Sequence, residues 1–370
     1  MVFRAQAETL PSGATPLPAS AYRSDVVLDD EFERIFLTHW LCAGRTDQLD
    51  EAGSYLALEV GNERVLVVRD DDGRLAAFDN VCRHRGTVLC TGPAGNVGRF
   101  IRCPFHAWTY GLDGRLVHAP LMEHVDGFDP SAFPLQPVTT AEWEGFVFVH
   151  LGADPEPFPS AWADVLTHFD RWGLQNLSVA RRTEYLVEAN WKLVVENYSE
   201  CYHCPSIHPR FADRCSYRSG QNDLHAGPFL GGFMELRPGY PTLSMNGERC
   251  AAPLPGLDDD DLGRVYFYAL FPNLLLSLHP DYVVAYTLWP ETPERTRVRC
   301  EWLFAAPRRA RYAPDDAFAF WDEANREDFT ALRRVQEGLR TRRQQPAPYS
   351  QQESLAAAFD EHVTRVLGDR

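Results

Sequence analysis

The spacing of apolar residues divides the chain into stretches of different secondary structure. From about residue 45 to 150, short apolar runs alternate with turn residues, and residues 64–69 and 75–78 flank the turn DDDG. Aspartate–glycine turns between apolar runs are strong signals of β-hairpins. A second such turn, LDG, follows Tyr110. We therefore predict a small antiparallel β domain over this stretch.

Helical spacing precedes this β domain. Residues 1–20 are rich in Pro, Ala, Ser and Thr and are expected to form a loose arm. A helix is predicted at about 29–41. Its apolar positions are Phe32, Ile35, Phe36 and Trp40. The segment 152–160 has three prolines in nine residues and is expected to be a linker.

The pattern beyond the linker combines helices with longer strands. A helix is predicted over 190–203, which Pro205 ends or kinks. Three strand-like runs follow, VYFYALFPNLLLSL, DYVVAYTLWP and RVRCEWLFAAP, and a long helix is predicted over 315–340. The expected fold class is α+β: an all-β domain, then a domain with an antiparallel sheet and a long C-terminal helix. We predict an arm and helix over 1–44, the β domain over 45–151 and the second domain over 161–370.

Composition limits the classes of partner. Of the 370 residues, 45% are hydrophobic and 24% are charged, which is typical of a soluble globular protein, and the net charge of −16 disfavours nucleic acid. No apolar run has transmembrane length, and the opening MVFRAQAETLPSG lacks the apolar core of a signal peptide. We expect a cytoplasmic protein without membrane contact. Five of the nine cysteines are expected to be reduced and structural: Cys42, Cys90, Cys215, Cys250 and Cys300.

Two short motifs in the β domain carry metal-ligand chemistry. Cys82-X-His84 and Cys103-X-X-His106 each supply one thiol and one imidazole. In a Rieske [2Fe–2S] centre two thiolates hold one iron and two imidazoles hold the other. A structural zinc site is the main alternative, but zinc sites usually separate paired ligands by two or more residues. Unliganded core cysteines are a second alternative. The spacing therefore predicts a centre that accepts and passes single electrons.

A second constellation lies in the predicted helix at 190–203 and just beyond it. Glu200, His203 and His208 stand in the order E-X-X-H-X-X-X-X-H, and Glu200 and His203 are expected to share a helix face. Two histidines plus one carboxylate form the facial triad of non-haem Fe(II) oxygenases. Two nearby histidines alone are more often ordinary core or surface residues. A Rieske motif in the same chain reverses that preference.

The third ligand is expected in the helix at 315–340, which offers Asp322 and Asp328, with Glu323 and Glu327 nearby. Asp328 interrupts a predicted core-facing stripe. The apolar members of that stripe are Trp321, Ala324, Leu332, Val335 and Leu339. A carboxylate on an apolar face needs a partner, and a metal ion is a good one. A salt bridge to Arg326 or Arg334 is the alternative.

These strings resemble a known family. CRHRG and CPFHAWTYG resemble the Rieske motif, and NWKLVVENYSECYHCPSIHP resembles the mononuclear-iron motif of Rieske non-haem iron oxygenase α-subunits, the ring-hydroxylating oxygenase family. The resemblance covers roughly residues 35–340. It implies a Rieske domain, a catalytic domain and ring-shaped trimers. The phrase ENYSECYHC, with Glu where many members have Asp, is most similar to the subgroup that oxidises carnitine, glycine betaine and proline betaine.

The resemblance also implies roles for individual residues. Cys82, His84, Cys103 and His106 would hold the cluster, and His203 and His208 would hold the iron. Asp328 would be the third ligand, because the family's ligand Asp precedes a helix ending in VQ-X-GL. Glu200 would connect His203 to a cluster histidine of a neighbouring subunit. Asn197 would lie beside the iron.

The predicted function follows from these parts. The chain would be an oxygenase component that uses O₂ to hydroxylate or N-demethylate a small substrate, with a quaternary ammonium compound favoured. Electrons would come from NAD(P)H through a separate flavin or ferredoxin-type reductase, because the chain has no G-X-G-X-X-G fingerprint after a strand. The alternatives are an aromatic-ring hydroxylating mono- or dioxygenase, a Rieske electron carrier, and a binding protein with two structural zinc ions.

Overall fold

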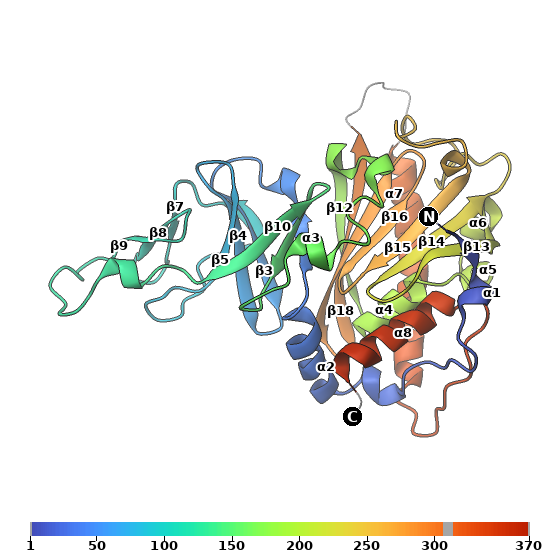
Figure 1. Ribbon diagram of the computed structural model, residues 1–370, viewed down its shortest axis with the longest axis horizontal. Helices are drawn as coiled ribbons and strands as arrows, with labels where there is room; N and C mark the ends of the chain where they lie inside the picture. The colour runs from blue at the N-terminus through green and yellow to red at the C-terminus, as the bar shows by residue number, and fades with distance from the viewer. Residues whose placement is uncertain (1, 306–313, 369–370) are drawn as a thin grey trace. The chain divides into compact units, whose positions relative to one another are not determined.

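The computed structural model describes residues 2–305 and 314–368, and the chain forms two compact units (Figure 1). The smaller unit spans residues Phe36–Ala161. The larger unit combines Met1–Ile35 with Trp162–Arg370. No helix in the described part of the chain is long and apolar enough to cross a membrane.

The smaller unit is built from two antiparallel sheets. A seven-stranded sheet has the order β2-β11-β10-β5-β4-β3-β6, and a three-stranded sheet has the order β7-β8-β9. Its helical turn α3 is Phe158–Ala161. The strands are β2 Leu41–Arg45, β3 Ser54–Val60, β4 Glu63–Arg69, β5 Leu75–Asp79, β6 Ala94–Asn96, β7 Phe100–Arg102, β8 Thr109–Gly111, β9 Leu116–His118, β10 Pro137–Trp143 and β11 Phe146–His150.

Both predicted hairpins are present in this unit. Strands β4 and β5 pair antiparallel, and the Oδ1 atom of Asp70 accepts hydrogen bonds from the amides of Asp72 (2.9 Å) and Arg74 (2.7 Å) in the turn between them. Gly73 has φ +78° there, a conformation that glycine adopts without strain. Strands β8 and β9 pair across the second turn. The hydrogen bonds of Asp70 therefore help to fix the register of the first hairpin, whereas the pairing of β8 with β9 shifts register between Thr109 and Tyr110.

The larger unit is built on one eight-stranded sheet with the order β1-β13-β14-β15-β16-β17-β18-β12. All its pairings are antiparallel. Most residues of its central strands are buried, so these strands read as continuous apolar runs. The strands are β1 Arg4–Ala5, β12 Leu177–Val187, β13 Cys215–Ala226, β14 Phe229–Leu236, β15 Arg264–Leu270, β16 Leu274–Leu278, β17 Val283–Thr292 and β18 Arg295–Ala305.

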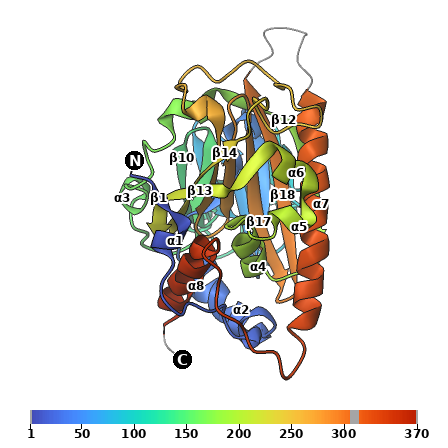
Figure 2. The same cartoon turned by 90° about the vertical axis from the view of Figure 1, so that its right-hand side faces the viewer.

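Helices of the larger unit pack together against this sheet. Helix α4 contacts α7, α8 and strands β15 and β17, and α7 is the longest helix of the described chain (Figure 2). Asn190 caps α4, since its side chain accepts a hydrogen bond from the Lys192 amide (3.0 Å). The helices are α1 Gln6–Thr9, α2 Asp25–Glu31, α4 Trp191–Tyr198, α5 Cys204–Ile207, α6 Pro209–Arg214, α7 Pro314–Gly338 and α8 Ser354–Leu367.

The predicted α+β class, the all-β domain, the antiparallel sheet and the long helix are confirmed. The first helix differs from the prediction: α2 begins after Ser24, whose side chain caps it, and a π-helical turn over Phe32–Phe36 ends the helical segment. Trp40 therefore lies outside the helix. The arm is also more ordered than expected, because β1 pairs with β13.

The helix predicted over 190–203 is shorter in the structure. It ends at Tyr198, because the Ser199 hydroxyl donates to the Val195 carbonyl (2.7 Å) and the Glu200 carboxylate accepts from the Tyr202 and His203 amides. Pro205 does not end this helix; it lies in the first turn of α5, where proline is favoured.

The core-facing stripe predicted for α7 holds except near its end. Val335 is 46% exposed, and Gln336 is buried instead. The Gln336 side chain accepts a hydrogen bond from the Asn190 amide (2.9 Å) and donates one to the Tyr22 carbonyl (3.0 Å). In the last turns of α7, the hydrogen-bonded side chain of Gln336 therefore occupies the buried position that was predicted for Val335.

Candidate metal centres

The two Cys/His loops of the smaller unit have the same backbone conformation. The Cys82 amide donates to Thr87 O (2.8 Å), and the Cys103 amide donates to Trp108 O (2.8 Å). Four residues after each cysteine the backbone is left-handed, with φ +72° at Gly86 and +58° at Ala107. Two separate segments thus form matching turns, each presenting a cysteine and a histidine.

The four side chains of these loops lie together. Cys82 and Cys103 are buried, and their thiols are within hydrogen-bonding range of each other. The ring centroids of His84 and His106 are 4.8 Å apart. The Tyr110 hydroxyl is 3.3 Å from the Cys82 sulfur. Two adjacent thiols beside two adjacent imidazoles fit the ligand set of a Rieske centre.

The two ends of this group differ in exposure. The thiols belong to the hydrophobic core that contains Trp108 and Tyr110, whereas the His84 ring is exposed and stacks on Trp108 at 4.8 Å. The four residues of this group would hold the cluster through two buried thiolates and through two imidazoles nearer the surface, and the cluster would supply one-electron chemistry.

A second group of ligands lies in the larger unit. One ligand atom from each of His203, His208 and Asp328 falls within 4.8 Å of the others. Asp328 Oδ1 is 2.9 Å from His208 Nε2 and 3.4 Å from His203 Nε2. His203 immediately precedes α5, His208 precedes α6, and Asp328 lies on α7. Two imidazole nitrogens converging on one carboxylate fit a facial-triad iron site.

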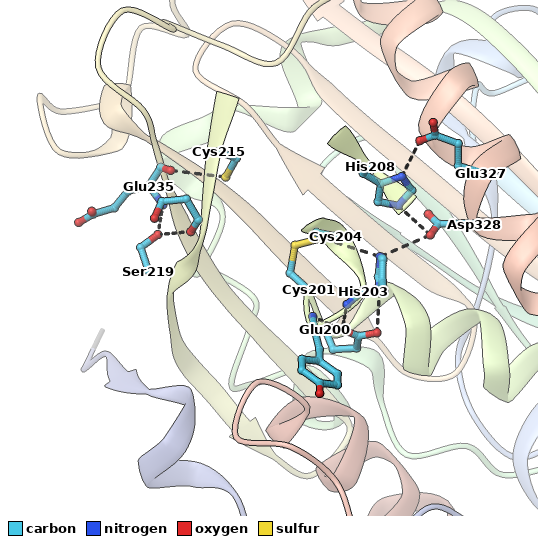
Figure 3. Close-up of a disulfide and its surroundings, with 12 residues drawn as sticks. Glu200, Cys201, His203, Cys204, His208, Cys215, Ser219, Glu235, Glu327 and Asp328 are labelled. Carbon is cyan, nitrogen blue, oxygen red and sulfur yellow. Dashed lines mark hydrogen bonds and ion pairs between the residues drawn. A yellow bond between two sulfur atoms is a disulfide. The ribbon is translucent and has the colours of Figure 1, made fainter. Parts of the chain in front are cut away.

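A further carboxylate stands behind each of these histidines. Glu200 Oε1 is 2.5 Å from His203 Nδ1, and Glu327 Oε2 is 2.7 Å from His208 Nδ1 (Figure 3). Although burial opposes protonation of His208, Asp328 and Glu327 outweigh it and raise its pKa to about 9. Burial likewise opposes protonation of His203, but Glu200 and Asp328 raise its pKa. The negative potential that favours a proton there also favours a metal cation.

Asp322, the other candidate for the third ligand, is engaged elsewhere. Its Oδ1 accepts a hydrogen bond from the Tyr185 hydroxyl (2.7 Å), and its Oδ2 pairs with Arg326 (2.8 Å). Arg326, a predicted salt-bridge partner of Asp328, is thus held by Asp322. Of the two aspartates, the structure brings Asp328 to the histidines.

A pocket opens beside the second group. It contains about 680 Å³ of space free of atoms, part of it open to solvent, and Asn197, Glu200 and Asp328 line it. Aromatic side chains form much of the remaining wall. They are Tyr198, Phe211, Phe233, Phe267 and Trp321. The predicted residue Asn197 therefore shares a pocket with the proposed iron ligand Asp328.

Two features of this region were missed in the sequence. Cys201 and Cys204 form a disulfide on either side of His203 (Figure 3); the spacing C-X-X-C was a signal for it. The contact of Glu327 with His208 had no local signal, because 119 residues separate them. None of the five cysteines predicted to be reduced forms a disulfide within the described chain.

The fold and the two groups of ligands define a class: a Rieske domain joined to a mononuclear-iron oxygenase domain. Residues 39–129 match the model of the Rieske [2Fe-2S] domain, and residues 174–369 match that of the ring hydroxylating alpha subunit (catalytic domain). The chain belongs to the ring-hydroxylating alpha subunit family, as its motifs indicated.

Relatives of known activity agree with this family. The glycine betaine monooxygenase oxygenase subunit of Pseudomonas aeruginosa is 30% identical over 365 residues, covering 90% of this chain and 84% of that protein. The carnitine monooxygenase oxygenase subunit of Escherichia coli K12 is 37% identical over 207 residues, covering 55% and 54%. A quaternary ammonium Rieske monooxygenase in complex with L-carnitine superposes with TM-score 0.79 at 25% identity, covering 96% and 97%.

The chain is therefore an oxidoreductase of the Rieske non-haem iron class. Its cofactors are a Rieske [2Fe–2S] cluster and a mononuclear iron. It is an oxygenase component that acts on a small molecule and takes electrons, originally from NAD(P)H, through a reductase.

Proposed function

We propose that this oxygenase component oxidises a quaternary ammonium compound, by hydroxylation or by oxidative N-demethylation. The observation that carries the proposal is the aromatic, acidic pocket beside the proposed iron ligands. The glycine betaine and carnitine enzymes among the relatives act on trimethylammonium compounds, which supports the same substrate class here.

The pocket wall has the chemistry of a cation cage. Phe211, Phe267 and Trp321 pack on one another with ring centroids 6.2–6.3 Å apart, and all three line the pocket. The charged residues among its described lining are Glu200 and Asp328, both acidic. A methylated ammonium over aromatic rings gains about 2 kcal/mol when desolvated, which is about thirtyfold in affinity. A neutral isostere gains no such attraction.

The proposed ligands are Cys82, His84, Cys103 and His106 for the cluster, and His203, His208 and Asp328 for the iron. When bound, the iron and the cluster supply O₂ activation and storage of one electron each; one oxygen atom enters the substrate and the other leaves as water. Glu200 accepts the Nδ1–H of His203 and thereby keeps that ring's Nε2 free for coordination. Asn197 contributes an amide to the pocket wall that also holds Asp328.

We further propose a homotrimer in which Glu200 connects His203 to His84 or His106 of the neighbouring subunit. The family resemblance supports this assembly. The reductase is proposed to be of the flavin or ferredoxin type. We also propose a cytoplasmic location, since within the described residues seven of the nine cysteines form no disulfide and only Cys201 and Cys204 are joined.

Single-turnover kinetics test the substrate class without a reductase. The holoprotein is reduced chemically and mixed with O₂ and either a trimethylammonium compound, its neutral tert-butyl isostere or a bicyclic aromatic hydrocarbon. We expect the trimethylammonium compound alone to accelerate reoxidation of the cluster and to yield an oxidised product. Acceleration by the hydrocarbon alone would indicate aromatic-ring hydroxylation. If none of the three compounds changes the rate of cluster reoxidation, the protein is an electron carrier.

A further inference from the structure

The ring of His208 lies between two carboxylates of helix α7, and the proposed iron site uses one of them. Asp328 faces Nε2 at 2.9 Å, and Glu327 faces Nδ1 at 2.7 Å (Figure 3). We propose that Glu327 is a positioning residue, which holds His208 so that its Nε2 points at His203 and Asp328. The inference rests on the iron-ligand set given under the proposed function.

Helix geometry explains how two neighbouring residues contact opposite ends of one ring. Consecutive side chains leave an α-helix about 100° apart, so Glu327 and Asp328 diverge around the imidazole. The His208 side chain is 5% exposed, whereas that of Glu327 is 33% exposed. Glu327 therefore reaches in from the solvent side and closes the outer edge of the ring.

The chemical consequence is control of the histidine tautomer. A carboxylate that accepts the Nδ1–H of an imidazole leaves Nε2 unprotonated and able to coordinate a metal. Glu200 has the same relation to His203. Two carboxylates from unconnected segments thus stand behind the two histidines. This repetition is not expected of a chance surface ion pair.

Glu323 shows what an ordinary carboxylate of this helix does. It lies one turn before Glu327 and pairs with the exposed Arg210 at 3.0 Å. Glu327 is also not placed as a ligand, because it contacts the ring edge opposite Nε2 and is not a member of the group whose ligand atoms lie within 4.8 Å. Its effect on the iron must pass through His208.

The test measures iron retention and the electronic structure of the site. Anaerobic holoprotein is mixed with a ferrous chelator to give the rate of Fe(II) loss, and the nitric oxide adduct of the ferrous site is recorded by EPR. Wild type is compared with Glu327→Ala, Glu327→Gln, the control Glu323→Ala and His208→Ala. Far-UV circular dichroism with thermal unfolding reports whether the larger unit of each variant is folded, and the visible absorption of the cluster reports on the smaller unit.

We expect Glu327→Ala to lose iron about 10–100-fold faster, the usual effect of removing such a partner, and to change the EPR line shape. Glu327→Gln keeps an oxygen acceptor and should lie between Glu327→Ala and wild type; it decides the question if Glu327→Ala does not fold. Wild-type behaviour of both Glu327 variants, with iron loss in His208→Ala, would overturn this inference alone. Iron retention in His208→Ala would overturn the ligand set and the inference together.

Discussion

The Oδ1 atom of Asp328 lies 2.9 Å from Nε2 of His208, although 120 residues separate them in the chain. Helix α7 carries Asp328, and the histidines lie at the two ends of the short helix α5 that follows α4, so packing of α7 against α4 helps to assemble the group. The proposed iron site therefore depends on tertiary structure, whereas the cluster ligands come from two local loops.

Replacement of Asp328 should empty the mononuclear site and spare the cluster. We expect Asp328→Ala to lose the mononuclear iron and all turnover, because the histidines alone leave the site one ligand short. Iron analysis and cluster absorption check this. Asp322→Ala is the matched control, since Asp322 binds Tyr185 and Arg326 instead. Iron loss in Asp322→Ala with full activity in Asp328→Ala would reassign the ligand.

Replacement of Glu200 should slow electron transfer and retain both metal centres. The amide of Glu200→Gln can still accept the Nδ1–H of His203 but carries no charge with which to attract a cluster histidine of the next subunit. We expect cluster oxidation in a single turnover to slow by at least about tenfold, which corresponds to about 1.4 kcal/mol of added barrier to electron transfer. Unchanged rates, or full activity of a monomer, would exclude the bridging role.

The aromatic wall of the pocket should bind a cationic ligand more tightly than a neutral ligand of the same shape. Phe267→Leu removes one ring that borders the pocket, and we expect it to weaken binding of a trimethylammonium substrate by about tenfold, which lies within the range for a partly desolvated cation–π contact. Binding of the tert-butyl isostere should change much less. Phe318→Leu is the control, because Phe318 packs on Trp302 and Phe304 and does not line the pocket. Equal losses for both ligands would point to simple apolar packing. Calorimetry provides the affinities.

His279 should make the larger unit sensitive to acid. It is buried against Tyr282, neither ring nitrogen has a hydrogen-bond partner within the described chain, and burial lowers its pKa to about 3. Its unfolded pKa is about 6.5, so between these values only the unfolded chain binds the proton. Above about pH 6.5 His279 is neutral in both states and does not reduce the free energy of unfolding. Below that pH its protonation in the unfolded chain lowers the free energy of unfolding by up to about 1.4 kcal/mol per unit of pH.

His279→Leu removes this titration. Denaturant unfolding at pH 7.5, 6.5 and 5.5 measures the free energy of unfolding of both proteins. As the pH falls, the free energy of unfolding of His279→Leu should increase relative to that of wild type. Parallel pH profiles would mean that His279 is protonated as readily in the folded protein as in the unfolded chain.

The sequence predicts what is local. The hairpin turns, the long helix and the spacing of the Cys/His motifs are each encoded within about twenty residues, and the predicted fold class is confirmed. The end of α4 was misplaced because periodicity does not register the side-chain hydrogen bonds of Ser199 and Glu200 that end the helix. Val335 was misjudged for a related reason: burial of Gln336 depends on partners in Tyr22 and Asn190, far away in the chain.

The candidate site shows the same division. Cys82, His84, Cys103 and His106 are predictable as one group because their motifs are short. The choice between Asp322 and Asp328 depends on which face of α7 meets the histidines, and the role of Glu327 depends on the same packing. These are tertiary relationships, and residue spacing alone does not contain them.

Metal and sulfide analysis of the anaerobically purified protein shows whether the two Cys/His loops hold a Rieske cluster and the larger unit holds iron. We predict about three iron atoms and two acid-labile sulfides per chain, with Rieske-type visible absorption. His106→Ala should abolish the sulfide and the absorption, whereas His118→Ala, an exposed histidine of the same unit, should retain both. Zinc in place of iron, with no sulfide, would mean that neither site is a redox centre.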